Sequence, residues 1–514
     1  METVPASRPA APVLPETLRG EIERFLDICG QPAILEPGLD PLPLVRDSYA
    51  LSCRGGFVLL EAWDDTRTFA RRVTGVEQQR PGRLQLAVQR FGRGPGSLTI
   101  ADLDDARTAP TLRRNRQESL AGRLAAMLAR QFPDWRVEEL TAGADLEHTL
   151  SPAHPRALLR RGARRLAALC APPSGGGEAL TFGLLWLAYL RKREAPQPVS
   201  GLALFLPRGE EVNTRLRVRH LHPERAAVQL FVYAVDEGGE QAVPPDDTGN
   251  LLTRLDPWHP PEPAAASEAM VWARLLTREP GVEAIEIGGG MVSLRVAGLE
   301  FARAAGKQFW LGVGRKRRGR SLADAVDLAR RLAAVRLNPD NPRGHEWARS
   351  HPEARLESLV RANLGVLDAS LRAAPVYGQV TAIAGRDRGL VDLLAIDHGG
   401  RLAVIELKAS EDPHLPLQAL DYWIRVRHHA AAGEFGPAGF FPGLPVRALA
   451  PRLLLVAPAL RFHSTTETLL EFLPSQLEVE RIGLGVEWQR RFRVILRVAG
   501  AARPEWPDPP PEGT

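Results

Sequence analysis

The sequence is poor in cysteine, and it lacks any long apolar run. Its 514 residues include only Cys29, Cys53 and Cys170, which are far apart and odd in number. Such a set excludes a disulfide framework and a cysteine-based zinc site, and it is typical of a reducing compartment. No segment approaches the ~20 consecutive apolar residues that a membrane-spanning helix requires.

An export signal and a strong charge excess are also missing. The first residues, METVPASRPAAPVLPETL, lack a basic start followed by an apolar core. We therefore expect a cytoplasmic protein with no membrane partner. Lysine and arginine exceed aspartate and glutamate by only 66 to 61. Contact with nucleic acid would therefore have to come from local basic clusters rather than from bulk charge.

Several segments of the first half of the chain reappear in the same order in the second half. GGFVLLEAWDDTRTFARR from residue 55 parallels GGGMVSLRVAGLEFARAA from residue 288 or 289, and ESLAGRLAAMLARQ from residue 118 parallels ESLVRANLGVLDAS from residue 357. Each match is weak, but their shared order predicts an internal duplication. The alternative is that the halves share only an alternation of strands and helices, without common ancestry.

We predict that each half contains a small strand-rich module followed by an α/β module. Stretches rich in Asn, Pro and Gly interrupt the periodic patterns between them. The predicted parts are a β-rich module with an N-terminal helix over residues 1–108, an α/β domain over 109–245, a proline-rich linker over 246–266, a second β-rich module over 267–340, a second α/β domain over 341–500, and a disordered tail over 501–514.

The stretch GLVDLLAIDHGGRLAVIELKAS, residues 389–410, reads as two apolar strands around a glycine turn. Because side chains alternate along a strand, Glu406 and Lys408 share one face. A two-residue turn would put Asp392 on the other face. A three-residue loop over 398–400, with a glycine in the left-handed conformation, would oppose Asp392 to Glu406. We predict this loop or a bulge.

Two carboxylates that meet in a buried place repel each other unless one keeps its proton or a hard cation lies between them. Mg²⁺ suits Asp392 and Glu406, since it binds oxygen ligands and retains waters, and the backbone carbonyl of Leu407 could complete the set. Lys408 could orient such a water or offset charge on a phosphate oxygen, which makes a phosphodiester the natural substrate. A structural Glu406–Lys408 ion pair is the alternative, but it leaves Asp392 unexplained.

These residues resemble the PD-(D/E)xK nuclease superfamily of restriction and repair endonucleases. The pattern is Asp392, then Glu406-x-Lys408 on the neighbouring strand, preceded by Glu357 on a helix. GLVDLLAIDHGGRLAVIELK also looks like the catalytic stretch of mismatch-specific endonucleases of the NucS kind. The resemblance covers roughly residues 350–460. It departs from the family at Val391, where a proline is common.

A second motif is similar to the Gln-x-x-x-Tyr motif of RecB-type nucleases. Gln418 and Tyr422 lie four apart, on one face of the expected helix LPLQALDYWIRVRHH. The resemblance implies a restriction-endonuclease-like α/β fold, with a mixed sheet flanked by helices. The implied catalytic residues are Asp392, Glu406, Lys408, Glu357, Gln418 and Tyr422, and the implied metal ligands are Asp392, Glu406 and the carbonyl of Leu407. Alternatively, Glu357 belongs to an ordinary amphipathic helix, and Gln418 and Tyr422 form a polar helix edge.

The basic segment RKRRGR, residues 315–320, is expected at the tip of a hairpin. A basic tip can bind a phosphate backbone through salt-sensitive contacts. The predicted DNA-binding residues are Arg315, Lys316, Arg317, Arg318 and Arg320. The alternative is a solvated loop.

The first half lacks the residues of the hairpin site. A constant shift of 236 puts Arg156, Cys170 and Pro172 in place of the two acids and the lysine, in that order. On the next helix, a shift of 237 puts Thr181 and Leu185 in place of the Gln-x-x-x-Tyr pair. If the duplication is real, the first α/β domain is a degenerate copy that serves as a scaffold, a pseudo-dimer partner or a second DNA-binding surface.

The sequence thus predicts a deoxyribonuclease that depends on Mg²⁺ or Mn²⁺ and hydrolyses DNA in repair, recombination or defence. The alternative is a non-catalytic nucleic-acid-binding or regulatory protein that keeps the nuclease fold. A third hypothesis is a phosphodiesterase that acts on RNA or on a small nucleotide.

Overall fold

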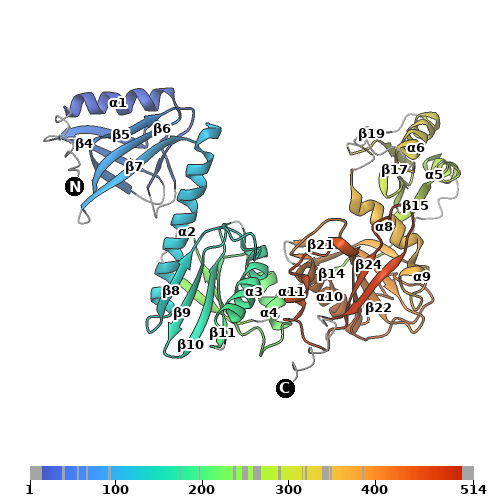
Figure 1. The fold of residues 1–514 in the computed structure, drawn as a ribbon. Coiled ribbons are helices and arrows are strands. Elements are labelled where there is room, and N and C mark those ends of the chain that lie inside the picture. The colour runs from blue at the N-terminus through green and yellow to red at the C-terminus, as the bar shows by residue number, and fades with distance from the viewer. Residues whose placement is uncertain are drawn as a thin grey trace, which may run out of the picture. The chain divides into compact units, whose positions relative to one another are not determined.

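Figure 1 shows the computed structural model of the chain, which forms two compact units. The first unit contains Met1–Gly209 and Gln229–Val243, and the second contains Glu210–Val228 and Pro244–Thr514. The residues that the structure describes are 14–36, 41–54, 57–64, 68–90, 94–173, 175–195, 197–234, 239–245, 253–258, 268–287, 291–314, 317–318, 321–337, 347, 350–384 and 387–500.

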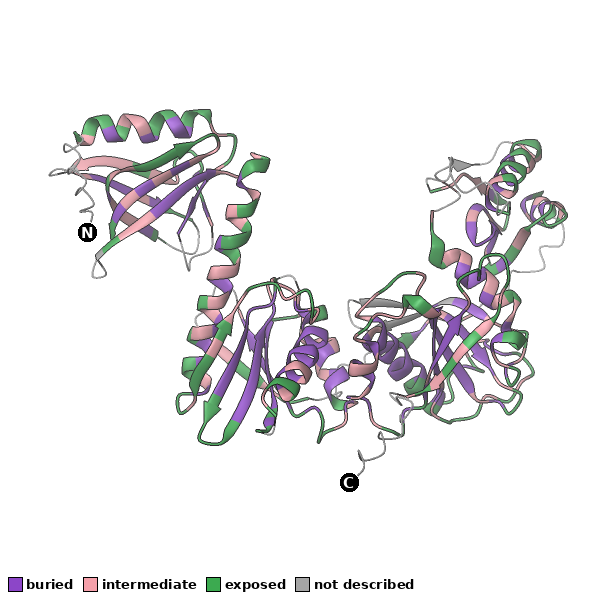
Figure 2. Cartoon of the chain, viewed as in Figure 1, coloured by how far each residue is buried: buried purple, intermediate pink, exposed green. Residues whose placement is uncertain are grey.

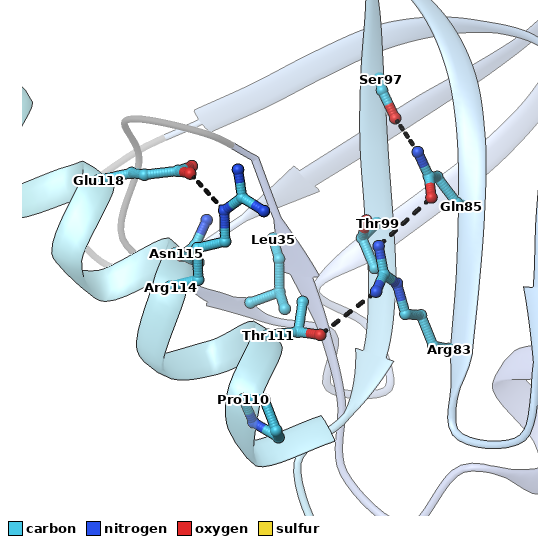
Figure 3. Close-up of a pocket in the computed structure, with 10 residues that line it drawn as sticks. All are labelled: Leu35, Arg83, Gln85, Ser97, Thr99, Pro110, Thr111, Arg114, Asn115 and Glu118. Atoms are coloured by element: carbon cyan, nitrogen blue, oxygen red, sulfur yellow. Dashed lines mark hydrogen bonds and ion pairs between the residues drawn. The ribbon is translucent and has the colours of Figure 1, made fainter. Parts of the chain in front are cut away.

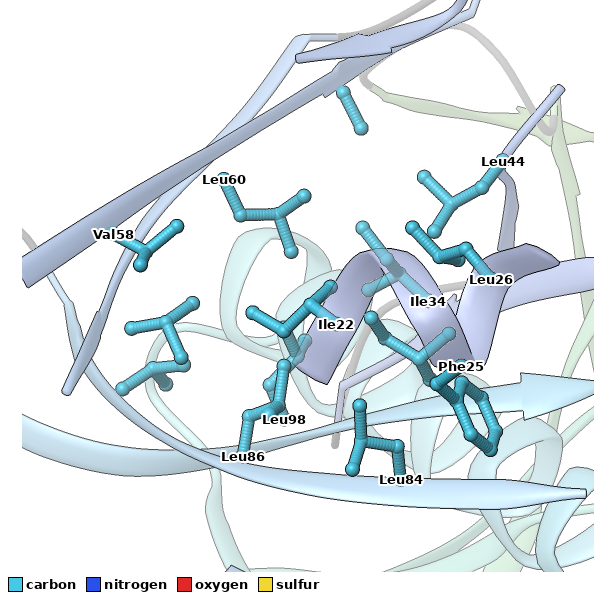
Figure 4. Packing of buried hydrophobic residues seen from close by; sticks show 14 of the residues in the cluster. Ile22, Phe25, Leu26, Ile34, Leu44, Val58, Leu60, Leu84, Leu86 and Leu98 are labelled. Atoms are coloured by element: carbon cyan, nitrogen blue, oxygen red, sulfur yellow. The ribbon is translucent and has the colours of Figure 1, made fainter. Parts of the chain in front are cut away.

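The first unit begins with a seven-stranded antiparallel sheet in the order β2-β1-β7-β6-β5-β4-β3. Its strands are β1 (Pro32–Leu35), β2 (Leu42–Pro43), β3 (Tyr49–Arg54), β4 (Phe57–Trp63), β5 (Thr68–Arg80), β6 (Arg83–Arg90) and β7 (Gly94–Asp102). Helix α1 (Pro15–Ile28) covers one face, because its apolar residues recur every three or four positions. Figure 4 shows Ile22 and Phe25 of α1 beside Leu84 and Leu98 of the sheet in this core.

A 3₁₀ turn, η1 (Ala106–Thr108), leads into α2 (Ala109–Gln131), whose first turns lie over the other face of this sheet. The second sheet of the unit has the order β13-β12-β11-β10-β9-β8. Its elements are β8 (Arg136–Thr141), β9 (Arg156–Arg161), β10 (Arg164–Cys170), α3 (Gly176–Arg193), β11 (Val199–Pro207), β12 (Val228–Tyr233) and β13 (Glu240–Val243). Alternating residues of β11 face α2 and α3, so the two helices cover opposite faces.

The second unit contains a five-stranded antiparallel sheet whose strands lie in chain order. They are β15 (Val282–Ile287), β16 (Met291–Val296), β17 (Leu299–Ala305), β18 (Gln308–Leu311) and β19 (Arg317–Arg318). Helices α5 (Glu268–Leu276) and α6 (Leu322–Arg336) pack on it through one apolar core. These elements are called the second β module below.

The second β module contacts helix α8 (Pro352–Ala362) at its β16–β17 turn. Gly298 lies in this turn with a φ of +80°, and a Cβ there would lie 1.8 Å from the carbonyl oxygen of Ala354 in α8. Buried Arg336 donates hydrogen bonds to the carbonyl oxygens of Ala297 and of Ser350, at 2.8 and 2.9 Å. The turn and the start of α8 are therefore held together.

The other sheet of the second unit has the order β14-β20-β21-β22-β23-β24-β25. Its elements are β14 (Thr253–Leu255), α8, α9 (Leu364–Leu367), β20 (Tyr377–Ala384), β21 (Asp387–Ile396), β22 (Leu402–Leu407), α10 (Leu415–Ala431), β23 (Arg452–Pro458), η2 (Ala459–Arg461), α11 (Thr466–Leu470), β24 (Val479–Leu484) and β25 (Val494–Ala499). The central strands β22 and β23 are buried almost throughout, as Figure 2 shows in purple. The chain is thus a mixed α/β protein with several sheets.

Apart from the additional edge strand β14 of the second, the two α/β sheets share one strand order. In each sheet an antiparallel hairpin, β9–β10 or β21–β22, is followed by a helix and then by a strand that pairs in parallel with the hairpin's second strand. The predicted domain limits stay predictions. Strand β14 lies inside the predicted linker 246–266 and pairs with β20, while the tail 501–514 lies outside the described residues.

Helix α4 (Val212–Arg219) belongs to the second unit, although the sequence assigns it to the first α/β domain. Arg217 of α4 makes a bidentate ion pair with Asp421 of α10, at 2.6 Å between Nη2 and Oδ2 and 2.8 Å between Nε and Oδ1. The side chains are only 11% and 9% exposed. The backbone N–H of His222 also donates to the carbonyl oxygen of Phe472 at 2.7 Å. These contacts therefore hold segment Glu210–Val228 to the second unit.

None of the described helices combines the length and the apolar character that crossing a membrane would need.

Candidate active site

The β21–β22 hairpin has the predicted three-residue loop. The strands pair from Leu393 opposite Ile405 to Ile396 opposite Leu402. The backbone N–H of Asp397 donates to the carbonyl oxygen of Arg401 at 2.9 Å, which leaves residues 398–400 as the loop. The same register, continued by one residue, places Asp392 opposite Glu406. The prediction of an odd loop is confirmed.

Gly400 supplies the left-handed residue of this loop, with a φ of +87°. A Cβ at this position would lie 2.3 Å from the carbonyl oxygen of Pro445, so only glycine fits without displacement. The Asp397 carboxylate also accepts a hydrogen bond from the backbone N–H of Arg401 at 2.8 Å. The loop conformation, and with it the facing of the two acids, is therefore determined locally.

Burial dominates the electrostatics of Asp392. It raises the pKa of this carboxyl from 3.8 to about 6, against a lowering by the backbone N–H of Leu407, which donates to Oδ2 at 2.9 Å. The charge of Glu357 raises the pKa further. Asp392 therefore keeps its proton to a higher pH than an ordinary aspartate, and a positive charge beside it would favour its ionised form.

Glu406 is more deeply buried, with 1% of its surface exposed. Burial first, and then the charge of Asp392, hold its pKa well above the ordinary value. Its Oε2 is buried and has no hydrogen-bond partner among the residues that the structure describes. A buried carboxylate oxygen without a donor, beside a second acid, is the arrangement that a hard divalent cation relieves.

Lys408 stays charged in this acidic surrounding. Burial lowers its pKa, but the carboxylates of Glu353, Asp412 and Glu406 outweigh burial, and the pKa is raised. Its Nζ lies 3.3 Å from Oδ2 of Asp412, and the side chain is 14% exposed. Lys408 is therefore a positive charge beside the two acids rather than a neutral base.

Glu357 lies beside the site but is bound by two arginines. Its Oε1 is 2.8 Å from Nη2 of Arg361 on the same helix and 3.3 Å from Nη1 of Arg295 on β16. The residue is 7% exposed. These contacts support the structural alternative for Glu357 without removing it from the site, since it lines the same pocket as Asp392.

Glu353, one turn earlier on α8, is the acid that sequence reasoning missed. It is exposed and lines the pocket, and its charge acts on Asp392, Glu406 and Lys408. Its spacing of four residues from Glu357 put both on one helical face, so the signal was present in the sequence. The sequence does not show whether Glu353 or Glu357 lies closer to the hairpin, because this depends on how α8 packs.

A pocket of about 510 Å³ gives access to this group. It is lined by residues of the α8 start, by Glu357 and by the hairpin, and includes His351, Glu353, Asp392, Leu407 and Ser410. His351 and Glu353 are exposed. Asp392 is therefore reached from solvent, whereas Glu406 lies behind it and does not line the pocket.

Helix α10 brings Gln418 and Tyr422 to the same region. Nε2 of Gln418 donates to the hydroxyl of Tyr422 at 3.2 Å. Burial first, and then the charge of Glu406, raise the pKa of the tyrosine. Tyr422 is therefore a neutral hydroxyl close to the acids.

The protein supplies only some of the ligands that a divalent cation would need, and waters would supply the rest. Across the described ranges, no group of three or more His, Cys, Asp or Glu side chains is arranged to hold a metal ion. Two carboxylates are present, and the backbone carbonyl of Leu407 remains the predicted third ligand. Mg²⁺ commonly binds with one or two carboxylates and several waters, so this set suits it.

The predicted basic cluster falls largely outside the described residues. Arg315, Lys316 and Arg320 lie there, whereas Arg317 and Arg318 form β19 and pair with Leu311 and Trp310 of β18. The antiparallel pair β18–β19 forms a hairpin, but it puts Arg317 and Arg318 in the second strand and not at the predicted tip.

No family model matches the chain, and no curated protein matches it. A solved structure described as EndoMS in apo form is similar over 38% of this chain and 85% of that chain, with 11% identity and a TM-score of 0.13. No family is therefore assigned to the chain.

Proposed function

We propose that the protein is a nuclease that hydrolyses DNA with Mg²⁺ or Mn²⁺ at the Asp392–Glu406–Lys408 group. The observation that carries the proposal is the orphaned Oε2 of buried Glu406, opposite an acid whose own pKa is raised. Burying two acids beside a lysine held cationic costs free energy, and perturbed groups of this kind, one of which lines a pocket, are typical of functional sites.

The proposed roles follow from the positions of the side chains. A divalent cation between the two acids would supply positive charge and a water of lowered pKa. Asp392 and Glu406 would hold it, and Lys408 would stabilise the charge that develops on the phosphate. Glu353, at the exposed wall of the pocket, would accept a hydrogen bond from the attacking water. Tyr422 would donate to a phosphate oxygen, oriented by Gln418.

We also propose that the two α/β modules are copies on one restriction-endonuclease-like fold, of which the first has lost its site. Their common strand order supports this. The first hairpin turns at Gly162 and Ala163, a loop one residue shorter than that of the second. The parallel pairing beside it then puts Leu169 and Ala171, rather than Cys170 and Pro172, at the places of Glu406 and Lys408.

Arg156, opposite Leu169, takes the place of Asp392 in this corrected alignment. An arginine, a leucine and an alanine cannot bind a cation in the proposed way. The first module would therefore act without cleaving.

The test is a cleavage assay with the full chain on single-stranded, duplex, mismatched and branched DNA and on RNA, with Mg²⁺, Mn²⁺ or EDTA. We expect metal-dependent cleavage that falls roughly 100-fold or more in Lys408→Ala and Glu406→Gln, in line with the loss of one charge-stabilising group. The matched control is Lys307→Ala, which removes an exposed lysine. Binding without cleavage under every condition would instead support the non-catalytic alternative. Cleavage of RNA alone would show that the substrate is RNA and not DNA.

A further inference from the structure

A second pocket, of about 440 Å³, lies in the first unit between the seven-stranded sheet and the first turns of α2 (Figure 3). Its floor is a row of residues across three strands, because Leu35 of β1 and Gln85 of β6 both pair with Thr99 of β7. The residues next to them along the strands, such as Leu84 and Ile100, point to the core under α1. The pocket therefore lies on the opposite face of the sheet from that core, and polar side chains form most of its lining.

Arg83 lies on β6 two residues before Gln85, on the same face of the sheet. Among the described residues, no acidic side chain forms an ion pair with it. Its Nη1 donates to the hydroxyl of Thr111 and its Nη2 to the amide oxygen of Gln85, each at 3.3 Å. Both bonds are long and go to neutral groups, and Nε is buried without a partner. A half-buried guanidinium in such a position lacks the anion that would compensate it.

Asn115 of α2 is a second side chain with unused hydrogen-bonding capacity. It is 5% exposed and lines the pocket. Its Nδ2 donates to the backbone carbonyl oxygen of Glu36 at 2.9 Å, whereas Oδ1 has no partner among the described residues. Buried polar atoms are normally paired, so an unpaired acceptor in the wall of a pocket that also holds a guanidinium without a counter-ion points to a ligand.

The charges on the walls favour an anion near Arg83. Thr111 lies in the first turn of the 23-residue helix α2, whose N-terminus carries a partial positive charge. The carboxylate of Glu118 is engaged by Nε of Arg114 at 2.8 Å. Glu77 accepts from Nε2 of Gln85 at 2.8 Å, on the side of Gln85 away from Arg83. The Arg83–Thr111 end is therefore positive.

We propose that this pocket binds a phosphate monoester of nucleotide size. The phosphate lies between the Arg83 guanidinium, the Thr111 hydroxyl and the N-terminus of α2, since arginine and helix N-termini are the groups that proteins use for phosphate. Asn115 lies in the wall of the same pocket, and its Oδ1, which is closed to solvent in this structure, accepts from a hydroxyl or amino group of the molecule once the side chain turns into the pocket. The ligand is either a free mononucleotide or the phosphorylated end of a strand. The site is independent of the proposed nuclease site, which lies in the second unit.

The test is isothermal titration calorimetry on the full chain carrying Lys408→Ala, in EDTA, so that DNA is not cleaved. The probes are adenosine monophosphate, adenosine, inorganic phosphate, and a short single strand with and without a 5′-phosphate. We expect binding of the nucleotide, the phosphorylated strand or both, and at least about tenfold weaker binding of their phosphate-free forms. Which of the two phosphorylated probes binds identifies the source of the ligand.

Arg83→Gln should weaken binding by about tenfold or more, whereas Arg24→Gln, which changes an exposed arginine of α1, should leave it unchanged. Thr111→Val repeats the test with a side chain of the same shape if Arg83→Gln does not fold. The proposal is overturned if neither phosphorylated probe binds below about 1 mM, or if binding survives both Arg83→Gln and Thr111→Val.

Discussion

The bidentate Arg217–Asp421 pair gives the sharpest prediction about stability. Both side chains are nearly buried, and the oxygen–nitrogen distances are 2.6 and 2.8 Å. Asp421→Ala leaves the guanidinium of Arg217 without its anion inside the second unit. Breaking a buried pair in this way costs about 3–5 kcal/mol, because the remaining charge is desolvated and has lost its bidentate counter-ion.

The effect should be visible in the melting of α10. A loss of this size lowers the unfolding temperature on the order of 10 °C in a unit of this length. Trp423 lies two residues from Asp421 on α10, with its ring centroid 6.0 Å from that of His220. The chain has ten tryptophans, so their fluorescence gives only a summed signal, whereas hydrogen exchange of α10 peptides follows the local transition even if the two units unfold separately.

Two further variants decide whether the pair itself is responsible. Replacing both partners by apolar residues, as in Arg217→Met with Asp421→Leu, should recover most of the loss, since no charge is left buried. The control is Asp256→Ala, which breaks an ion pair with Arg254 whose side chains are 75% and 42% exposed. It should cost less than about 1 kcal/mol. If Asp421→Ala costs no more than this control, the pair does not hold segment Glu210–Val228 to the second unit.

Three further predictions concern the candidate active site. Burial raises the pKa of Asp392 from 3.8 to about 6, so the folded state binds this proton more tightly than the unfolded state, and stability falls as the pH rises from about 4 to 6. In EDTA we expect the free energy of unfolding, measured by thermal unfolding, to fall by about 3 kcal/mol over this window. The fall should be absent in Asp392→Asn, and Mg²⁺ should restore the lost stability above pH 6. A free energy that does not change with pH would refute this prediction. Gly400→Ala should destabilise by about 1–3 kcal/mol and abolish cleavage, because it combines a positive φ with a clash. Gly365→Ala, which meets nothing within 4 Å, is its control in denaturant titration. Glu357→Gln should destabilise the protein by about 3 kcal/mol, because Arg295 and Arg361 lose their carboxylate partner. Glu353→Gln should leave the melting temperature unchanged and reduce cleavage. If the two variants show the opposite effects, the structural and catalytic roles assigned to the two acids are exchanged.

The hairpin of the site could be predicted from the sequence because its causes are local. Side-chain alternation sets which residues share a face, and the glycines near the turn permit the left-handed position that a three-residue loop needs. Together these two rules put Asp392 opposite Glu406. If the two α/β domains are copies, as proposed, the constant shift that pairs Cys170 with Glu406 is wrong by one residue, because the turn at Gly162 and Ala163 is one residue shorter than the loop 398–400.

Long-range contacts could not be predicted in the same way. Glu357 meets Arg295, 62 residues earlier on another sheet, and Arg217 meets Asp421 across 204 residues. No periodicity or spacing in a single sequence indicates such partners, because they depend on how helices pack. The same limit applies to Asn115 and Arg83, whose unpaired atoms become evident only when α2 lies over the sheet.

The contact between Gly298 and Ala354 has a practical consequence for dissecting the protein. A shortened chain that keeps residues 350–500 but omits the second β module would leave the first turn of α8 without the neighbours that support it. Such a fragment would lose activity by loosening the scaffold around Glu353, even if the module never touches DNA. Point substitutions on the module's outer surface, rather than deletions, are the way to learn whether it recognises a substrate.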